Sequence, residues 1–153
     1  MRQLLMTLIL LGSLSAASAS DAVTGSVVKV LPLFLDLKGH DAVSPSLFDR
    51  DAYQAYLRVH TNEVSTVRYD VLWKASNTGT ARLKLRVELR GIGAGGLPKQ
   101  ATLEQKMIPK SSRSWTSITF GRGDYKNFGE IISWRVTLWD GDQLLGEQKS
   151  FLW

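Results

Sequence analysis

The chain has no cysteine among its 153 residues and only four prolines. Without a thiol it can form neither a disulfide nor a thiolate metal site, and it lacks a cysteine nucleophile and the cysteine of a bacterial lipid anchor. A domain of this size without disulfides must be held together by packing. The length is sufficient for one domain with a substantial core.

Motifs of catalysis are also absent. The sequence has no G-x-S-x-G elbow and no H-E-x-x-H zinc motif. Its two histidines, His40 and His60, lie in polar segments without a second ligand at metal spacing, which is typical of surface histidines. Carboxylates such as Glu88 and Glu104 would serve acid–base chemistry only in a shared cleft. We therefore expect a non-enzymatic protein without a cofactor or metal.

The first nineteen residues are typical of a secretory signal peptide. Arg2 forms a short basic region, Leu4 to Leu14 is an apolar run, and Ala17-Ser18-Ala19 is a small-x-small cleavage signal. A membrane anchor is the alternative, but the run is short for about 30 Å of hydrocarbon. We predict cleavage after residue 19, leaving residues 20–153 as one secreted or periplasmic domain.

The net charge of +5 raises the question of nucleic-acid binding. The basic residues Arg82, Lys84, Arg86 and Arg90 alternate along one predicted strand, but no nucleic-acid motif accompanies them, and an export signal argues against a genomic partner. We expect a solvated face and no nucleic-acid partner. An acidic cell-surface polymer and an anionic lipid surface are the alternative partners of this basic strand.

The clearest pattern in the chain is the alternation between Ser65 and Gly91. A period of two places each apolar set on one face of a strand. The pattern predicts a β-hairpin around Asn77-Thr78-Gly79, which sets Trp73 opposite Leu83 and Asp70 opposite Arg86. The alternative is that the two strands lie in different sheets. The two apolar sets are Val67, Tyr69, Val71 and Trp73, and Leu83, Leu85, Val87 and Leu89.

Further strands are predicted on both sides of this segment. Ser26 to Leu37 contains Pro32, which lacks a ladder donor, so an edge strand is expected there. The turn Asp140-Gly141-Asp142 predicts a second hairpin, although such carboxylates also occur in Ca²⁺ sites. The other predicted strands are Ala101 to Ile108, Ser114 to Phe120, Ile132 to Leu138 and Leu144 to Trp153.

Between Ser44 and His60 the apolar period becomes helical. Ser44 is the predicted cap and Pro45 the first helical residue, with Arg58 late in the helix as its dipole favours. We expect the helix to cover a sheet edge or an open end of the core with its apolar stripe. The stripe consists of Leu47, Phe48, Ala52, Ala55, Tyr56 and Val59.

Two glycine-containing segments resemble functional motifs. Gly91 to Gly96 has a G-x-G-x-G spacing, but no predicted helix follows to hold a phosphate, so a loop is expected. Gly121 to Asp124 reads GRGD, which contains the integrin-binding tripeptide. Such tripeptides recur by chance, and we expect a turn, after which Tyr125 and Phe128 close the end of the core.

Together these patterns predict a mainly β, single-domain antiparallel β-sandwich of about seven strands, with one short helix inserted near residues 45–59. From Val27 to Trp153 the organisation resembles the immunoglobulin-like or fibronectin type III-like class, which implies adhesion, binding or scaffolding. A small outer-membrane β-barrel ending in Phe151-Leu152-Trp153 is less favoured, because several segments are too short or too weakly alternating to span a membrane.

Two functions stay open. The favoured one is an exported binding or structural domain of the cell envelope or extracellular space, which engages a protein through a sandwich face or edge. The alternative is a carbohydrate-binding module, because exposed aromatic rings stack on sugars. For that ligand we predict Trp115, Tyr125 and Trp139 as the binding residues. Trp139 and Trp134 alternate, so they should point to opposite faces.

Overall fold

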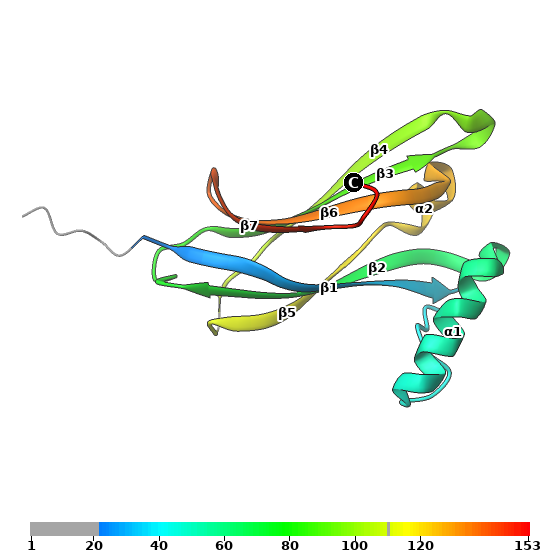
Figure 1. Cartoon of the computed structure of the whole chain (residues 1–153), viewed down its shortest axis with the longest axis horizontal. Coiled ribbons are helices and arrows are strands. Elements are labelled where there is room, and N and C mark those ends of the chain that lie inside the picture. The colour runs from blue at the N-terminus through cyan, green and yellow to red at the C-terminus, as the bar shows by residue number, and fades with distance from the viewer. Residues whose placement is uncertain (1–21, 110) are drawn as a thin grey trace, which may run out of the picture.

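The structure is a computed structural model that describes residues 22–109 and 111–153 (Figure 1). The predicted signal peptide lies outside these residues. Within them the chain forms two antiparallel sheets in two layers. The three-stranded sheet contains β1 (Thr24–Asp36), β2 (Val64–Ser76) and β5 (Arg113–Thr119) in the order β1-β2-β5. The four-stranded sheet, in the order β4-β3-β6-β7, contains β3 (Leu83–Ile92), β4 (Pro98–Lys106), β6 (Glu130–Asp140) and β7 (Gln143–Lys149).

This arrangement confirms the predicted seven-stranded immunoglobulin-like sandwich. β1, β2 and β5 correspond to strands A, B and E of that fold, and β4, β3, β6 and β7 to C′, C, F and G. Two helices are present in the described residues, α1 (Leu47–Val59) and α2 (Arg122–Phe128), with two short 3-10 turns, η1 (Thr61–Glu63) and η2 (Ala94–Gly96). The prediction of a single helix missed α2.

The predicted hairpin around Asn77 is wrong. β2 and β3 lie in different sheets, and the segment between them crosses from one layer to the other. Arg86 therefore pairs with Glu104 of β4, at 2.6 Å, and not with Asp70. Alternation did not distinguish the two arrangements, because both direct the same two apolar sets toward one core.

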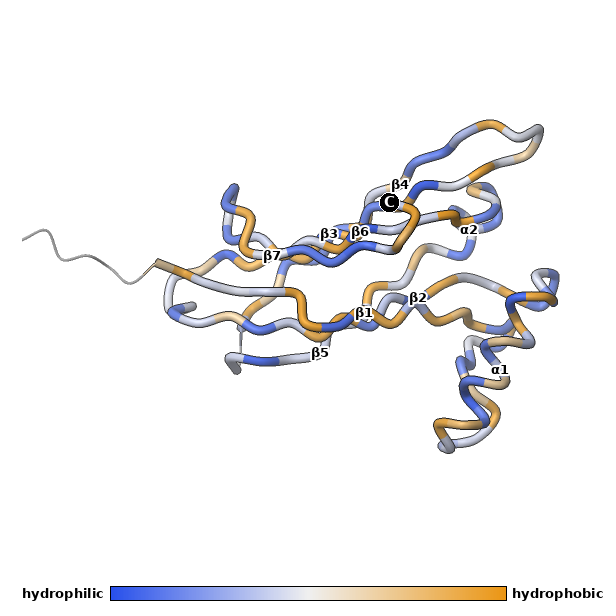
Figure 2. Tube along the Cα trace, in the orientation of Figure 1, coloured by the Kyte–Doolittle hydropathy of each residue, from blue (hydrophilic) through white to orange (hydrophobic). Residues whose placement is uncertain are grey.

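The core lies between the two layers. Tyr69, Val71, Leu85, Val87 and Val136 are almost completely buried there. Figure 2 shows apolar and polar residues alternating along the strands, as expected for sheets with one buried face. The second predicted hairpin is confirmed, since β6 and β7 pair on either side of the Asp140–Asp142 turn.

The segment that reads GRGD does not form the expected turn. Gly121 is the residue that precedes α2, and Arg122 to Asp124 form the first turn of that helix. Phe128, at the helix end, packs edge-to-face on Phe120 with ring centroids 5.4 Å apart. As predicted, this segment closes the end of the core.

Candidate functional site

Helix α1 is the element that this sandwich adds to the edge of its three-stranded sheet. It lies at the end of the molecule opposite the start of β1 (Figure 1). Ser46, and not Ser44, caps the helix by accepting a hydrogen bond from the Asp49 N–H. Ser44 instead donates its hydroxyl to the Asp49 carboxylate, at 2.5 Å, and Pro45 precedes the cap. The helix therefore begins two residues later than predicted.

Gln54 joins α1 to the open edge of β1. Its side-chain oxygen accepts the Phe34 N–H at 2.7 Å, and its amide nitrogen donates to the carbonyls of Phe34 and Asp41, both at 2.9 Å. The Gln54 amide thus replaces a neighbouring strand, because it satisfies both main-chain groups that β1 exposes at Phe34. Leu57, one turn later, is fully buried. Sequence reasoning missed Gln54, because nothing local marks this glutamine as buried.

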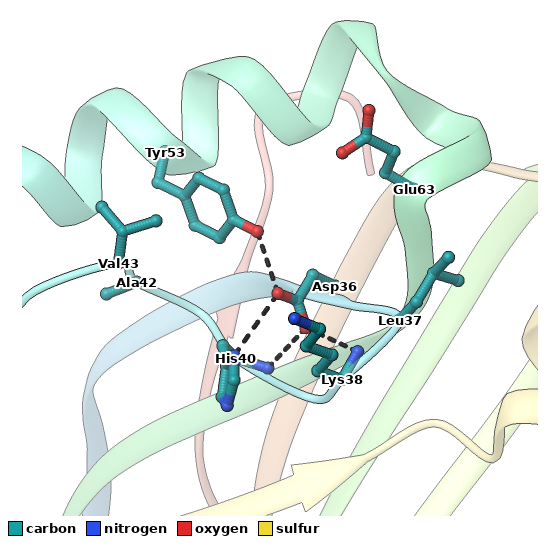
Figure 3. Close-up of a pocket in the computed structure, with 8 residues that line it drawn as sticks. All are labelled: Asp36, Leu37, Lys38, His40, Ala42, Val43, Tyr53 and Glu63. Atoms are coloured by element: carbon teal, nitrogen blue, oxygen red, sulfur yellow. Dashed lines mark hydrogen bonds and ion pairs between the residues drawn. The ribbon is translucent and has the colours of Figure 1, made fainter.

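A second link joins Asp36, at the end of β1, to the same helix face. Its carboxylate accepts the Tyr53 hydroxyl at 2.9 Å and the N–H groups of Lys38 and His40 at 2.8 Å (Figure 3). Burial alone would raise the pKa of Asp36, but these hydrogen bonds lower it below its ordinary value. Asp36 therefore holds both the 37–40 turn and α1.

Acid is expected to release α1 from β1. Because the pKa of Asp36 is lower in the folded chain than its usual 3.8, its contribution to stability is complete above about pH 5 and is lost as the pH falls through the folded pKa. Hydrogen-exchange protection of the α1 amides, corrected for intrinsic rates, should decrease between about pH 6 and about pH 3. In Asp36→Asn, protection should be low at both values. An equal decrease in that variant would assign the effect to another group.

Helix α1 covers the edge of β1, as predicted, but its apolar stripe faces outward and not toward the sheet. Phe48 and Val59 are 81% and 76% exposed, and Ala52 and Ala55 between them are exposed too. The helix turns inward the opposite face, with Tyr53, Gln54 and Leu57. The prediction for the stripe failed because hydrogen bonding to β1, through Gln54 and Tyr53, sets the helix orientation. The four residues Phe48, Ala52, Ala55 and Val59 are called the outer stripe below.

A pocket of about 660 Å³ lies between α1 and the 36–43 segment (Figure 3). Tyr53 and Asp36 in its wall bind each other, while Glu63 accepts the Tyr56 hydroxyl at 2.7 Å. The carboxylates of Asp36 and Glu63 and the Tyr53 hydroxyl are thus engaged in hydrogen bonds that hold the fold. Within residues 22–109 and 111–153, no three histidine, aspartate or glutamate side chains are grouped as metal ligands would be.

The structure places the three predicted ligand-binding residues on separate surfaces. Trp115, on β5, is 49% exposed on the outer side of the three-stranded sheet, opposite Leu72. Tyr125 lies in α2, where its ring packs on Phe120 and burial raises its pKa. Trp139 lies half-buried on the outer side of the other sheet. These three rings therefore do not form one platform.

The outer side of the four-stranded sheet combines arginines with tryptophans. Trp139 lies under the Arg86 guanidinium, 5.2 Å from the ring centroid, while Trp134 faces the core, as the predicted alternation requires. Trp153, which the sequence analysis did not select, has the Arg90 guanidinium 4.0 Å from its ring centroid. Each of these arginines occupies a ring face that a sugar would need for stacking.

The fold and this edge helix define the chain as an immunoglobulin-like β-sandwich with a helical insertion between its first two strands. No family model and no curated protein matches it. The crystal structure of an immunoglobulin-like protein from Pseudomonas aeruginosa is similar over 86% of this chain and 97% of that chain, with 14% identity and a TM-score of 0.39. No helix in residues 22–109 and 111–153 combines the length and apolar character needed to cross a membrane.

Proposed function

We propose that this protein is an exported, non-enzymatic binding or structural domain that engages a protein partner through the outer stripe of α1. The observation that carries the proposal is the orientation of α1. The helix satisfies the edge of β1 with Gln54 and buries Leu57, yet leaves Phe48 and Val59 in solvent. Contiguous exposed apolar side chains on a folded domain are typical of an interaction site.

The charges beside the outer stripe favour a protein over a lipid surface. Asp49 and Asp51 lie on its two sides, and Arg58 is the basic residue of the last turn. Helices that lie on anionic membranes are instead rich in lysine and arginine on the polar face. A mixed-charge border around an apolar strip is the usual composition of a protein interface.

The proposal is tested by photocrosslinking in the exporting cell. A photoreactive amino acid at Phe48 should give strong protein adducts in the periplasmic or secreted fraction. The matched control is the same amino acid at Leu144 of β7, which is 46% exposed but lies outside α1. Adducts at Phe48 should exceed those at Leu144 at least tenfold. Equal yields at both positions would contradict a protein site on α1.

A second candidate function is carbohydrate binding at Trp115. Nearly half of this side chain is exposed on the edge strand β5, and its ring is the most exposed of the three predicted residues. A single open indole can stack on one sugar ring. Loss of polysaccharide retention in Trp115→Ala, with retention unchanged in Trp139→Ala, would favour this candidate.

A further inference from the structure

We propose that the partner of the outer stripe is a second copy of this chain, packed with its α1 antiparallel about a two-fold axis between Gln54 and Ala55. The inference rests on the proposed function, since it takes α1 as a protein interface. It adds the identity of the partner and the symmetry of the contact.

The first argument is the spacing of the outer stripe. Phe48, Ala52, Ala55 and Val59 are separated by four, three and four residues, so the stripe has the same spacing in both directions. A two-fold interface requires a surface that is complementary to itself. The midpoint of the stripe lies between Tyr53 and Gln54, and the proposed axis is offset from it by one residue. When two copies run antiparallel about this axis, the side chains of one stripe therefore fall between those of the other. The alanines lie at the centre and allow the helix axes to approach to about 8 Å.

The second argument is the position of two charges. Asp51 and Arg58 are seven residues apart, close to two helical turns, so they lie on the same side of the outer stripe. Reversing one helix about the proposed axis places Asp51 of each copy at the level of Arg58 of the other. Both side chains are exposed, and within residues 22–109 and 111–153 the ion pair of Asp51 is a 3.5 Å contact with Arg50.

Parallel packing lacks this complementarity. Asp49 and Asp51 lie on opposite sides of the outer stripe, because they differ by two positions at 100° per residue. A parallel two-fold pair brings opposite sides together, so Asp51 of one copy would lie beside Asp49 of the other. Two like charges at that distance disfavour the arrangement. The charges therefore select the antiparallel pair.

The contact is small, and this sets the expected strength. Thirteen helical residues extend about 20 Å, so one helix face buries less than the roughly 800 Å² per partner of a stable interface. We expect a weak dimer, with a dissociation constant in the micromolar range or above. Sedimentation of the purified mature chain should therefore show a monomer that dimerises as its concentration rises.

The absence of cysteine makes a direct test available. In Ala55→Cys, the two introduced thiols lie beside the two-fold axis. When the two helix axes are about 8 Å apart, the Cα atoms of the two cysteines are about 4–6 Å apart, within the range of a disulfide. Oxidation should give a covalent homodimer in most of the protein. The control is Gln143→Cys, another exposed position, at the start of β7, which should give at least tenfold less.

Charge reversal tests the antiparallel pairing. Asp51→Arg and Arg58→Asp should each weaken dimerisation at least tenfold, because each creates two repulsive contacts. An equimolar mixture of the two variants, and the double variant, should both recover it. Circular dichroism checks that the monomers stay folded.

Three results would overturn the inference: no self-association up to about millimolar protein, association without recovery in the mixture, or equal disulfide yields at the two cysteine positions. Adducts at Phe48 with a different protein alone would remove the homodimer while keeping the proposed function. Absence of adducts at Phe48 would remove both.

Discussion

Gln54→Leu is expected to lower the free energy of unfolding by about 2–4 kcal/mol, although leucine is similar in size and more apolar. The substitution leaves the N–H and C=O of Phe34 and the carbonyl of Asp41 without their partner. Buried groups left unpaired cost more than the hydrogen bonds contribute. Denaturant unfolding measures the difference.

The control for Gln54→Leu is Gln105→Leu on β4, where the side chain is exposed and a change of less than about 0.5 kcal/mol is expected. Since α1 contacts β1 and η1 but no other strand extensively, its amides should lose exchange protection before the strands do. If both leucine variants unfold alike, Gln54 does not hold the edge of β1.

Gly129→Ala is expected to lower the free energy of unfolding by about 3 kcal/mol or more, which is enough to prevent folding of a marginally stable domain. Gly129 joins α2 to β6 with φ +91° and ψ −147°, a backbone conformation that is essentially restricted to glycine. A Cβ there would also overlap the Ile92 carbonyl oxygen and lie 2.9 Å from the Gly93 Cα. Both neighbours are main chain, so β3 and β6 would have to separate.

Gly79→Ala is the matched control, since its Cβ would meet nothing within 4 Å and its φ is not positive. This variant should be neutral or slightly more stable, because alanine restricts the unfolded chain. Thermal unfolding of the two variants beside the wild type measures the effect. A small, equal change in both would show that the Gly129 corner adapts easily.

The helix illustrates how far local reasoning extends. Its period and the late Arg58 predicted α1 to within a few residues, because helical spacing is a property of neighbours in the chain. Which face turns inward was predicted incorrectly. The bonds that orient α1 join Gln54 and Tyr53 to Phe34 and Asp36, seventeen to twenty residues away. No feature within the helix records those partners.

For the aromatic residues too, the sequence predicted the local orientation but not the surroundings. Alternation correctly predicted that Trp134 and Trp139 point to opposite sides of β6. Alternation carried no information on what lies above each ring. The contacts of Arg86 with the Trp139 ring and of Arg90 with the Trp153 ring were therefore not predicted. Trp115 and Trp139 belong to strands of different sheets, and this separation follows from the strand order in the two sheets, which alternation does not predict.

By itself, the sequence determined the β class, the inward face of most strands and the existence of α1, because side-chain periods of two and 3.6 residues follow from local backbone geometry. The tertiary structure alone decided that β2 and β3 belong to different sheets and that the outer stripe of α1 faces solvent. Both outcomes depend on hydrogen bonds and packing between segments far apart in the chain. Amphipathic periodicity is satisfied equally well by several such arrangements.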